Sequence, residues 1–186
     1  MFKAMALIWA AFHGHIDIVR ALLADERVDP NLADKYGRTA LIDAASHGHG
    51  DIVNMLLADE RIDPNHGNLY GSTALIWAAR RGHSNIVCAL LSDERVEPNR
   101  TNGIGETALI RAAVFGHIDI VRALLADERV NPNHADKDGY TATMLEFIFN
   151  PDSDFPLILT TGPYVMPNEY PYQSYIPKQM DFEKND

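Results

Sequence analysis

A 27-residue segment from Thr39 to Asn65, TALIDAASHGHGDIVNMLLADERIDPN, recurs along the chain at a fixed interval. Related copies begin at Met5, Thr73 and Thr107, so the period is 34 residues. Four copies at one period are typical of a repeat array, in which each unit covers the apolar face of its neighbour. We therefore expect one elongated domain rather than the one or two ordinary domains that 186 residues could form.

Apolar residues at helical spacing predict two short helices in each copy, seen at 41–45 and 52–57 in the second. Gly48-His49 lies between them, and glycine readily ends a helix. The first helix has a threonine in the N-cap position, at Thr39, Thr73, Thr107 and Thr141. Since isolated helices below ~12–15 residues are marginal, stacking must supply the stability.

A polar connection follows each second helix and predicts an extended finger that ends in a tight turn. It contains a proline (30, 64, 98 and 132) and, seven residues later, a glycine (37, 71, 105 and 139). An acidic pair precedes an arginine here, as in Asp25-Glu26-Arg27. Acids are unfavourable at a helix C-terminus, so either the arginine offsets them or the helix ends earlier.

The pattern D-x-x-G-x-T-A-L-I-x-A-A-x-x-G-H-x-x-I-V-x-x-L-L, over about residues 3–149, resembles the ankyrin repeat. In two departures, T-A-L-I replaces T-P-L-H, and the longer D-E-R-V-D-P-N extends the usual period of about 33 residues. The resemblance implies an all-α solenoid of stacked helix-turn-helix units with β-hairpin-like fingers. A tetratricopeptide array is the alternative, although that family lacks the polar finger and has other aromatic markers.

We expect an ankyrin-repeat domain over residues 1–149, with about four full repeats at 3–33, 34–67, 68–101 and 102–135, and a degenerate partial repeat at 136–149. The first copy has no preceding finger or cap, so Phe2, Met5, Leu7 and Ile8 are expected to be under-covered. Either the protein extends further upstream, or another segment docks there. Residues 150–186 hold six of the ten prolines and four of the seven tyrosines, and they carry six acids against two lysines. This composition predicts a largely disordered tail, with a linear motif or delivery signal as the alternative.

The net charge of −10 argues against nucleic-acid or anionic-membrane partners, because phosphate binding needs a basic surface. The single cysteine, Cys88, fits a reducing compartment, and we expect a cytoplasmic protein. Its slot holds Arg20, Asn54 and Arg122 in other copies, which predicts a partly exposed helix face. The start AMALIWAAF resembles a secretory signal, but the same pattern recurs inside the chain, and no apolar run approaches the ~20 residues that span a bilayer.

We find no catalytic constellation, phosphate-binding loop or cofactor motif, and we expect a non-enzymatic chain without a cofactor. The pairs His13/His15 and His47/His49 could suggest metal binding, but the second histidine belongs to the Gly-His turn, and no further ligands complete a zinc site. We therefore predict no metal.

Positions that vary between copies indicate where a partner binds, because the apolar core positions do not vary. The resemblance implies that they line the groove and the finger rim, and tyrosine, tryptophan and arginine are enriched at binding hot spots. Packing of the tryptophans against the next repeat is the alternative reading. The candidates are Trp9, Phe12, Tyr36, Arg38, Tyr70, Trp77, Arg80, Arg81, Ile104, Arg111, Phe115 and Tyr140.

The resulting prediction is a monomeric scaffold that binds a partner protein, offering apolar and acidic groups, through its groove and finger tips. One alternative is an adaptor or host-directed effector, acting in host-cell cytoplasm, whose tail carries a second motif. An enzyme is the third reading, and no residue pattern supports it.

Overall fold

The computed structural model describes residues 2–142 and 144. In this part of the chain, the residues fold into eight α-helices joined by turns and loops. They are α1 (Phe2–Phe12), α2 (Ile16–Leu23), α3 (Ala40–Ser46), α4 (Gly50–Leu57), α5 (Ala74–Arg81), α6 (Ser84–Leu91), α7 (Ala108–Val114) and α8 (Ile118–Leu125).

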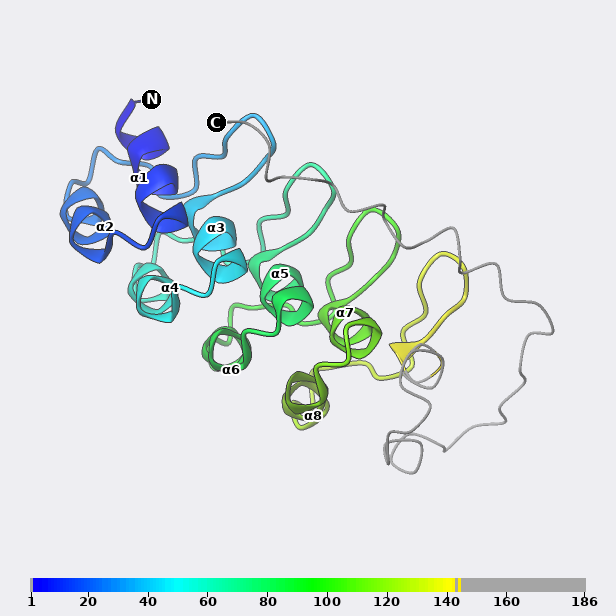
Figure 1. The fold of residues 1–186 in the computed structure, drawn as a ribbon. Helices are drawn as coiled ribbons and strands as arrows, with labels where there is room; N and C mark the ends of the chain where they lie inside the picture. The colour runs from blue at the N-terminus through cyan, green and yellow to red at the C-terminus, as the bar shows by residue number, and fades with distance from the viewer. Residues whose placement is uncertain (1, 143, 145–186) are drawn as a thin grey trace. The chain divides into compact units, whose positions relative to one another are not determined.

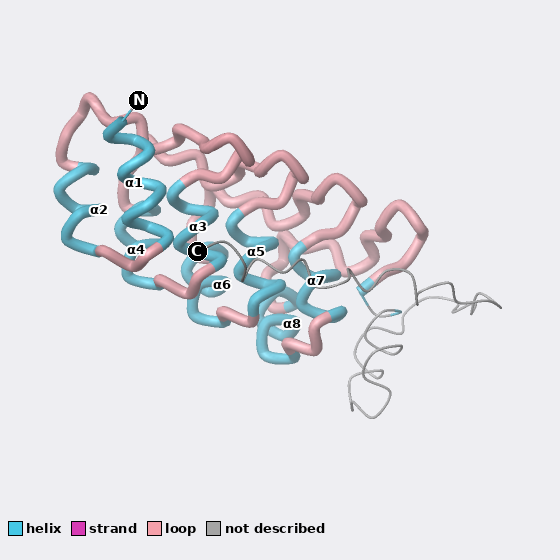
Figure 2. Tube along the Cα trace, turned by 45° about the horizontal axis from the view of Figure 1, so that its top comes forward, coloured by secondary structure: helices cyan, strands magenta, loops and turns pink. Residues whose placement is uncertain are grey.

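The helices form two layers, which Figures 1 and 2 show side by side. In the inner layer α1, α3, α5 and α7 pack successively on one another, and α2, α4, α6 and α8 do the same in the outer layer. Small residues such as Ala44 and Ala78 are fully buried between the inner helices, with larger side chains such as Leu56 and Ile86 between the layers. The predicted all-α solenoid is confirmed.

Local sequence signals set the ends of the inner helices. Thr39, Thr73 and Thr107 are N-caps whose hydroxyl groups accept from the backbone N–H three residues later. Gly82 ends α5 in the left-handed conformation, with φ of 80°, which glycine adopts without the steric cost of a Cβ. Asp51 lies in the first turn of α4, where the helix dipole favours a carboxylate.

The fingers are tight turns that contact one another along the array. In the first, Asp34 N–H donates to Arg38 O and Gly37 N–H donates to Asp34 O, both at 2.9 Å. Leu69 N–H in the next finger donates to Tyr36 O at 3.0 Å. Within the described residues, β pairing is limited to one antiparallel bridge between Ala135 and Thr141.

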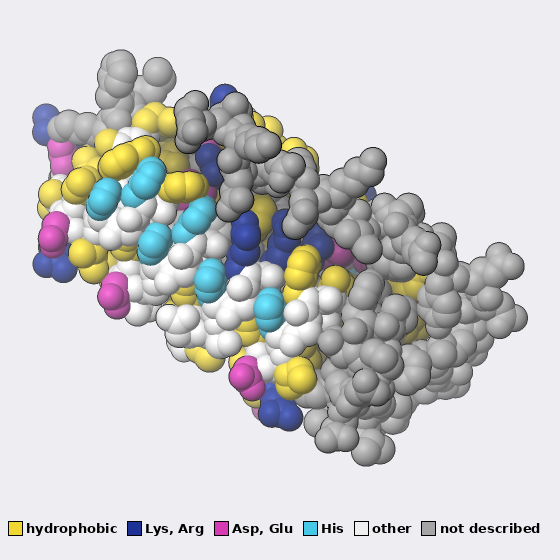
Figure 3. Space-filling view, viewed as in Figure 1, with side chains coloured by type: hydrophobic (Ala, Val, Ile, Leu, Met, Phe, Trp, Pro, Cys, Tyr) yellow, Lys and Arg dark blue, Asp and Glu magenta, His cyan; other side chains and the backbone are white. Residues whose placement is uncertain are grey.

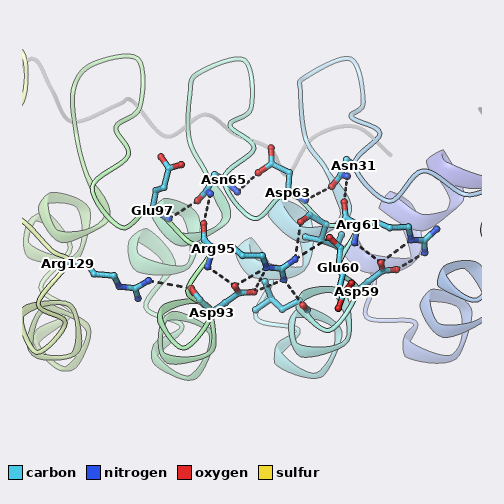
Figure 4. Close-up of polar contacts among 12 residues, drawn as sticks. Asn31, Asp59, Glu60, Arg61, Asp63, Asn65, Asp93, Arg95, Glu97 and Arg129 are labelled. Atoms are coloured by element: carbon cyan, nitrogen blue, oxygen red, sulfur yellow. Dashed lines mark hydrogen bonds and ion pairs between the residues drawn. The ribbon is translucent and has the colours of Figure 1, made fainter.

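Arginines from the D-E-R motif join consecutive repeats (Figure 4). Each outer helix ends before the acidic pair, at Leu57 in α4, so Asp59 lies beyond the helix rather than in its last turn. Arg61 forms an ion pair with Asp59 at 2.6 Å and donates to Leu23 O, at the end of the preceding outer helix, at 2.9 Å. Arg95 makes the equivalent contacts with Asp93 and Leu57 O, and Arg129 makes them with Asp127 and Leu91 O. Both explanations offered for the motif are thus correct.

Asparagines of the P-N motif form a second row of contacts beside the arginines (Figure 4). The Asn31 amide donates to Arg61 O at 2.6 Å and accepts from Asp63 N–H at 2.8 Å. Asn65 and Asn99 repeat this pattern against the next connection. The D-E-R-V-D-P-N connection is therefore a bonded seam between repeats.

The expectation of poor cover at the first repeat is wrong for two of its residues. Leu7 and Ile8 are buried, because α1 packs against both α2 and α3, whereas Met5 is 43% exposed. The side chain of Phe2, residues 143 and 145–149 of the partial repeat, and the 150–186 tail lie outside the described residues. Thr141 accepts from Met144 N–H at 3.4 Å, so the threonine cap of the partial repeat is formed.

Candidate protein-binding surface

The C-terminal ends of the inner helices carry most of the candidate side chains. These side chains come from the part of α1, α5 and α7 just before each Gly-His turn. They lie in register, one repeat beside the next. We call this the aromatic–arginine surface; it comprises Trp9, Phe12, Trp77, Arg80, Arg81, Arg111 and Phe115. Figure 3 shows apolar, basic and histidine side chains side by side over these elements.

In the N-terminal half of this surface, aromatic side chains contact imidazoles. Trp9 is 54% exposed, and its ring lies 4.2 Å from that of His13. The half-buried Phe12 lies 4.1 Å from the ring of His47 in the next repeat. His47 Nδ1 donates to Asp43 O at 2.8 Å, which fixes the imidazole orientation. This half is apolar and aromatic rather than cationic.

The histidines of the Gly-His turns connect neighbouring repeats. His49 Nε2 donates to Phe12 O at 3.0 Å, and His117 Nε2 donates to Arg80 O at 3.1 Å. Figure 3 shows the histidines as a row across the array. Among the residues that the structure describes, no three His, Cys, Asp or Glu side chains are grouped so that they could hold a metal ion.

In the C-terminal half, arginines lie against aromatic rings. The Arg80 guanidinium is 5.0 Å from the centroid of Trp77 and 5.6 Å from that of Phe115. Arg81 is 5.9 Å from Trp77. Arg111 lies 6.0 Å from Phe115 and forms an ion pair with Glu106 at 2.7 Å. These distances are those of cation–π contacts.

Arg38 is part of an ion-pair network within the chain, at the base of the first finger. It bonds to Asp34 at 2.8 Å and lies 3.4 Å from Asp43 in α3. Burial of Asp43 raises the pKa of its carboxyl group to about 6, against the attraction of Arg38 and with a contribution from the charge of Asp34. Desolvation disfavours the charged form of Asp34, but hydrogen bonds from Arg38 and Tyr36 outweigh it and lower the pKa of this carboxyl group.

The fingertips divide into exposed and covered positions. Tyr36 and Tyr70 are 49% and 67% exposed, and Lys35 Nζ lies 4.9 Å from the Tyr36 ring. Ile104 is half-buried, and Tyr140 is buried at 8% exposure. The fingers extend from the inner layer, on the side opposite the outer helices (Figure 1). The structure therefore brings Tyr36 and Tyr70 to the exposed rim and leaves Tyr140 within the fold.

Sequence reasoning missed three residues of this region. Leu69 is the most exposed large apolar side chain among the described residues, at 72%, beside Tyr70. Its slot varies between copies, with Lys35, Gly103 and Lys137, which was a usable signal. His13 and Glu106 also lie in slots that vary between copies, but their contacts with Trp9 and Arg111 could not be read from the sequence.

A family model described as ankyrin repeats (3 copies) matches residues 2–68 and 75–145. The chain belongs to the ankyrin-repeat family, whose members generally act as protein–protein interaction modules and are typically non-enzymatic. No curated protein matches the chain in a sequence comparison. None of the helices in the described residues is long and apolar enough to cross a membrane.

Proposed function

We propose that this protein binds a partner protein through the aromatic–arginine surface and the fingertip residues Tyr36, Leu69 and Tyr70. The observation that carries the proposal is the exposure of large apolar side chains on this face, with Trp9, Tyr70 and Phe115 all more than 40% exposed. Such residue types supply most of the binding energy at protein interfaces, with single hot spots contributing about 2 kcal/mol or more.

The rigidity of the scaffold favours binding. The inner helices are held by buried apolar contacts, and each turn is bonded to its neighbour by a histidine. The side chains that meet a partner are therefore ordered before the encounter, so less entropy is lost on association. Binding of this kind is non-covalent and involves neither a reaction step nor a cofactor.

The test is capture by the full-length chain of proteins from a cell lysate. We expect the combined Tyr36→Ala, Tyr70→Ala, Trp77→Ala and Arg80→Ala variant to lose the proteins that the wild type captures, with its helical circular dichroism intact. The matched control replaces Arg20, Asn54, Cys88 and Arg122, which share one exposed slot on the outer helices. Unchanged capture by the inner-face variant, or equal loss in the control, would refute the proposal.

A further inference from the structure

Arg80 is a half-buried cation that has no carboxylate partner among the described residues. Within the part of the chain that the structure describes, ion pairs engage Arg27, Arg38, Arg61, Arg95, Arg100, Arg111 and Arg129, but no carboxylate lies within ion-pair distance of Arg80. Burial lowers the pKa of the Arg80 guanidinium, and the charges of Arg111 and Arg81 lower it further. A charged group in such surroundings is costly unless it is paired.

The surroundings of Arg80 are locally positive in an acidic protein. Among the described residues, the charges of Arg81 and Arg111 act on Arg80, and the opposing charge is the carboxylate of Glu106, which is paired with Arg111. The whole chain has a net charge of −10. At physiological salt, charges are screened over about 8–10 Å. The positive charge around Arg80 therefore attracts an anionic group only at short range, once that group lies on this surface.

Two hydrogen-bond donors in the same group of side chains have no acceptor within the described part of the chain. Trp77 Nε1 and Arg111 Nε are buried, and no hydrogen-bond partner for either lies among the described residues. Buried donors are normally paired, so each marks a place where an acceptor is missing. Glu106 does not supply both, since its carboxylate already binds Arg111 Nη2 and the Asn102 amide, each at 2.7 Å.

The preceding repeat provides an internal comparison. In repeat two the slot of Trp77 holds Asp43, and the arginine at its finger base, Arg38, pairs with it at 3.4 Å. The slot of Arg80 there holds the neutral Ser46. The positive charge is therefore balanced within the chain in repeat two, by Arg38 and Asp43, and in repeat four, by Arg111 and Glu106. In repeat three, Arg80 has no such partner among the described residues and stays available to a ligand.

We propose that Arg80, between Trp77 and Phe115, binds a carboxylate of the partner: an aspartate or glutamate of a peptide segment with an adjacent aromatic or aliphatic side chain. This inference rests on the proposed function and names the partner chemistry. A guanidinium lying on aromatic rings keeps its N–H edges available for two parallel bonds to a carboxylate. The rings of Trp77 and Phe115 contact the apolar neighbour. Nucleic acids and anionic membranes fit less well, because the acidic chain repels dense negative charge.

The experiment is selection of a random-peptide library displayed on phage against the full-length chain. Wild type is compared with an Arg80→Gln/Arg81→Gln variant, and with Arg20→Gln as a control on the outer layer. We expect wild type and the control to enrich peptides that pair Asp or Glu with an aromatic or aliphatic residue, and the double variant to lose this acidic preference.

A synthetic peptide from the selection gives the quantitative readout. In a Trp9→Phe background Trp77 is the only tryptophan, so its fluorescence reports binding at this site. Replacement of the peptide's acid by its amide, or Arg80→Gln in the protein, should each weaken binding by about tenfold or more. The two changes combined should cost little more than either alone, because they remove the same contact.

The outcomes separate this inference from the proposed function. If no peptide is enriched, the carboxylate site is refuted, and the capture experiment alone decides the proposed function. If peptides are enriched without acids, or if the amide peptide binds equally well, the carboxylate site is refuted while protein binding stands. If a synthetic peptide of residues 150–186 binds this site more tightly than any selected peptide, the ligand is the chain's own tail, and the assignment to a separate partner is wrong.

Discussion

The guanidinium of Arg95 donates to the carbonyl oxygen of Leu57, 2.7 Å away across the boundary between two repeats. Leu57 is the last residue of α4, where backbone carbonyls have no partner within the helix. The same side chain holds Asp93 at 2.7 Å and reaches Ile62 O at 3.3 Å. One residue thus satisfies the helix end of the preceding repeat and the connection of its own, at the C-terminus where the helix dipole favours a cation.

Replacement of Arg95 by Gln should lower the free energy of unfolding by about 1–2 kcal/mol, since partly exposed charge-assisted bonds across the repeat boundary are lost. Arg27 is the matched control: it occupies the same slot in the first repeat and bonds only to Asp25 among the described residues. Arg27→Gln should therefore change stability much less. Urea unfolding followed by circular dichroism measures both, and equal effects would show that the contacts to Leu57 and Ile62 contribute nothing.

Asp43 should make stability fall as pH rises. Its pKa is about 6 in the folded chain against an ordinary 3.8, so the folded state binds the proton more tightly. The resulting stability is fully present below pH 3.8 and is lost as pH rises through about 6. An amide at this position cannot titrate, so the unfolding free energy of wild type relative to Asp43→Asn should fall by roughly 1–3 kcal/mol between about pH 4 and pH 7. Parallel curves for the two proteins would contradict this.

Gly82→Ala should be more destabilising than Gly139→Ala. Both glycines have positive φ, 80° and 86°, so both substitutions carry the left-handed strain of about 1 kcal/mol or more. A Cβ at residue 82 would also lie 2.8 Å from His117 Cε1, whereas a Cβ at residue 139 would have no described atom within 4 Å. Thermal unfolding should therefore give the larger decrease in Tm for Gly82→Ala. Equal decreases would mean that the His117 ring moves aside without cost.

The helices and turns could be predicted from sequence because local signals determine them. Helical spacing, threonine caps and the Gly-His turn involve residues close together in the sequence. The four copies show the same pattern, so each supports the helix boundaries predicted for the others. The exposure of Cys88 also followed, since the same slot is polar in the other copies. The burial of Leu7 and Ile8 was mispredicted, because it depends on how closely α1 packs on α2 and α3.

The contacts between repeats could not be predicted, because they join atoms about one period apart in the chain. Arg61 to Leu23 and Asn31 to Asp63 depend on the lateral spacing of neighbouring units. For the candidate surface, residue type indicated Trp77 and Arg80, but not that Arg38 and Arg111 are already paired with Asp43 and Glu106. Nor did it separate the exposed Tyr70 from the buried Tyr140.

Site-specific photo-crosslinking of the bound partner tests the binding face most directly. A photoreactive phenylalanine would replace Trp9, Tyr70 or Phe115 on the inner helices and fingers, or Arg20, Asn54 or Cys88 on the outer helices, one position at a time in the full-length chain. All six side chains are exposed, so the two sets differ in the face they occupy rather than in access. The structure predicts crosslinks to the partner from the first set and none from the second. Crosslinks mainly from the outer set would contradict the assignment of the binding face.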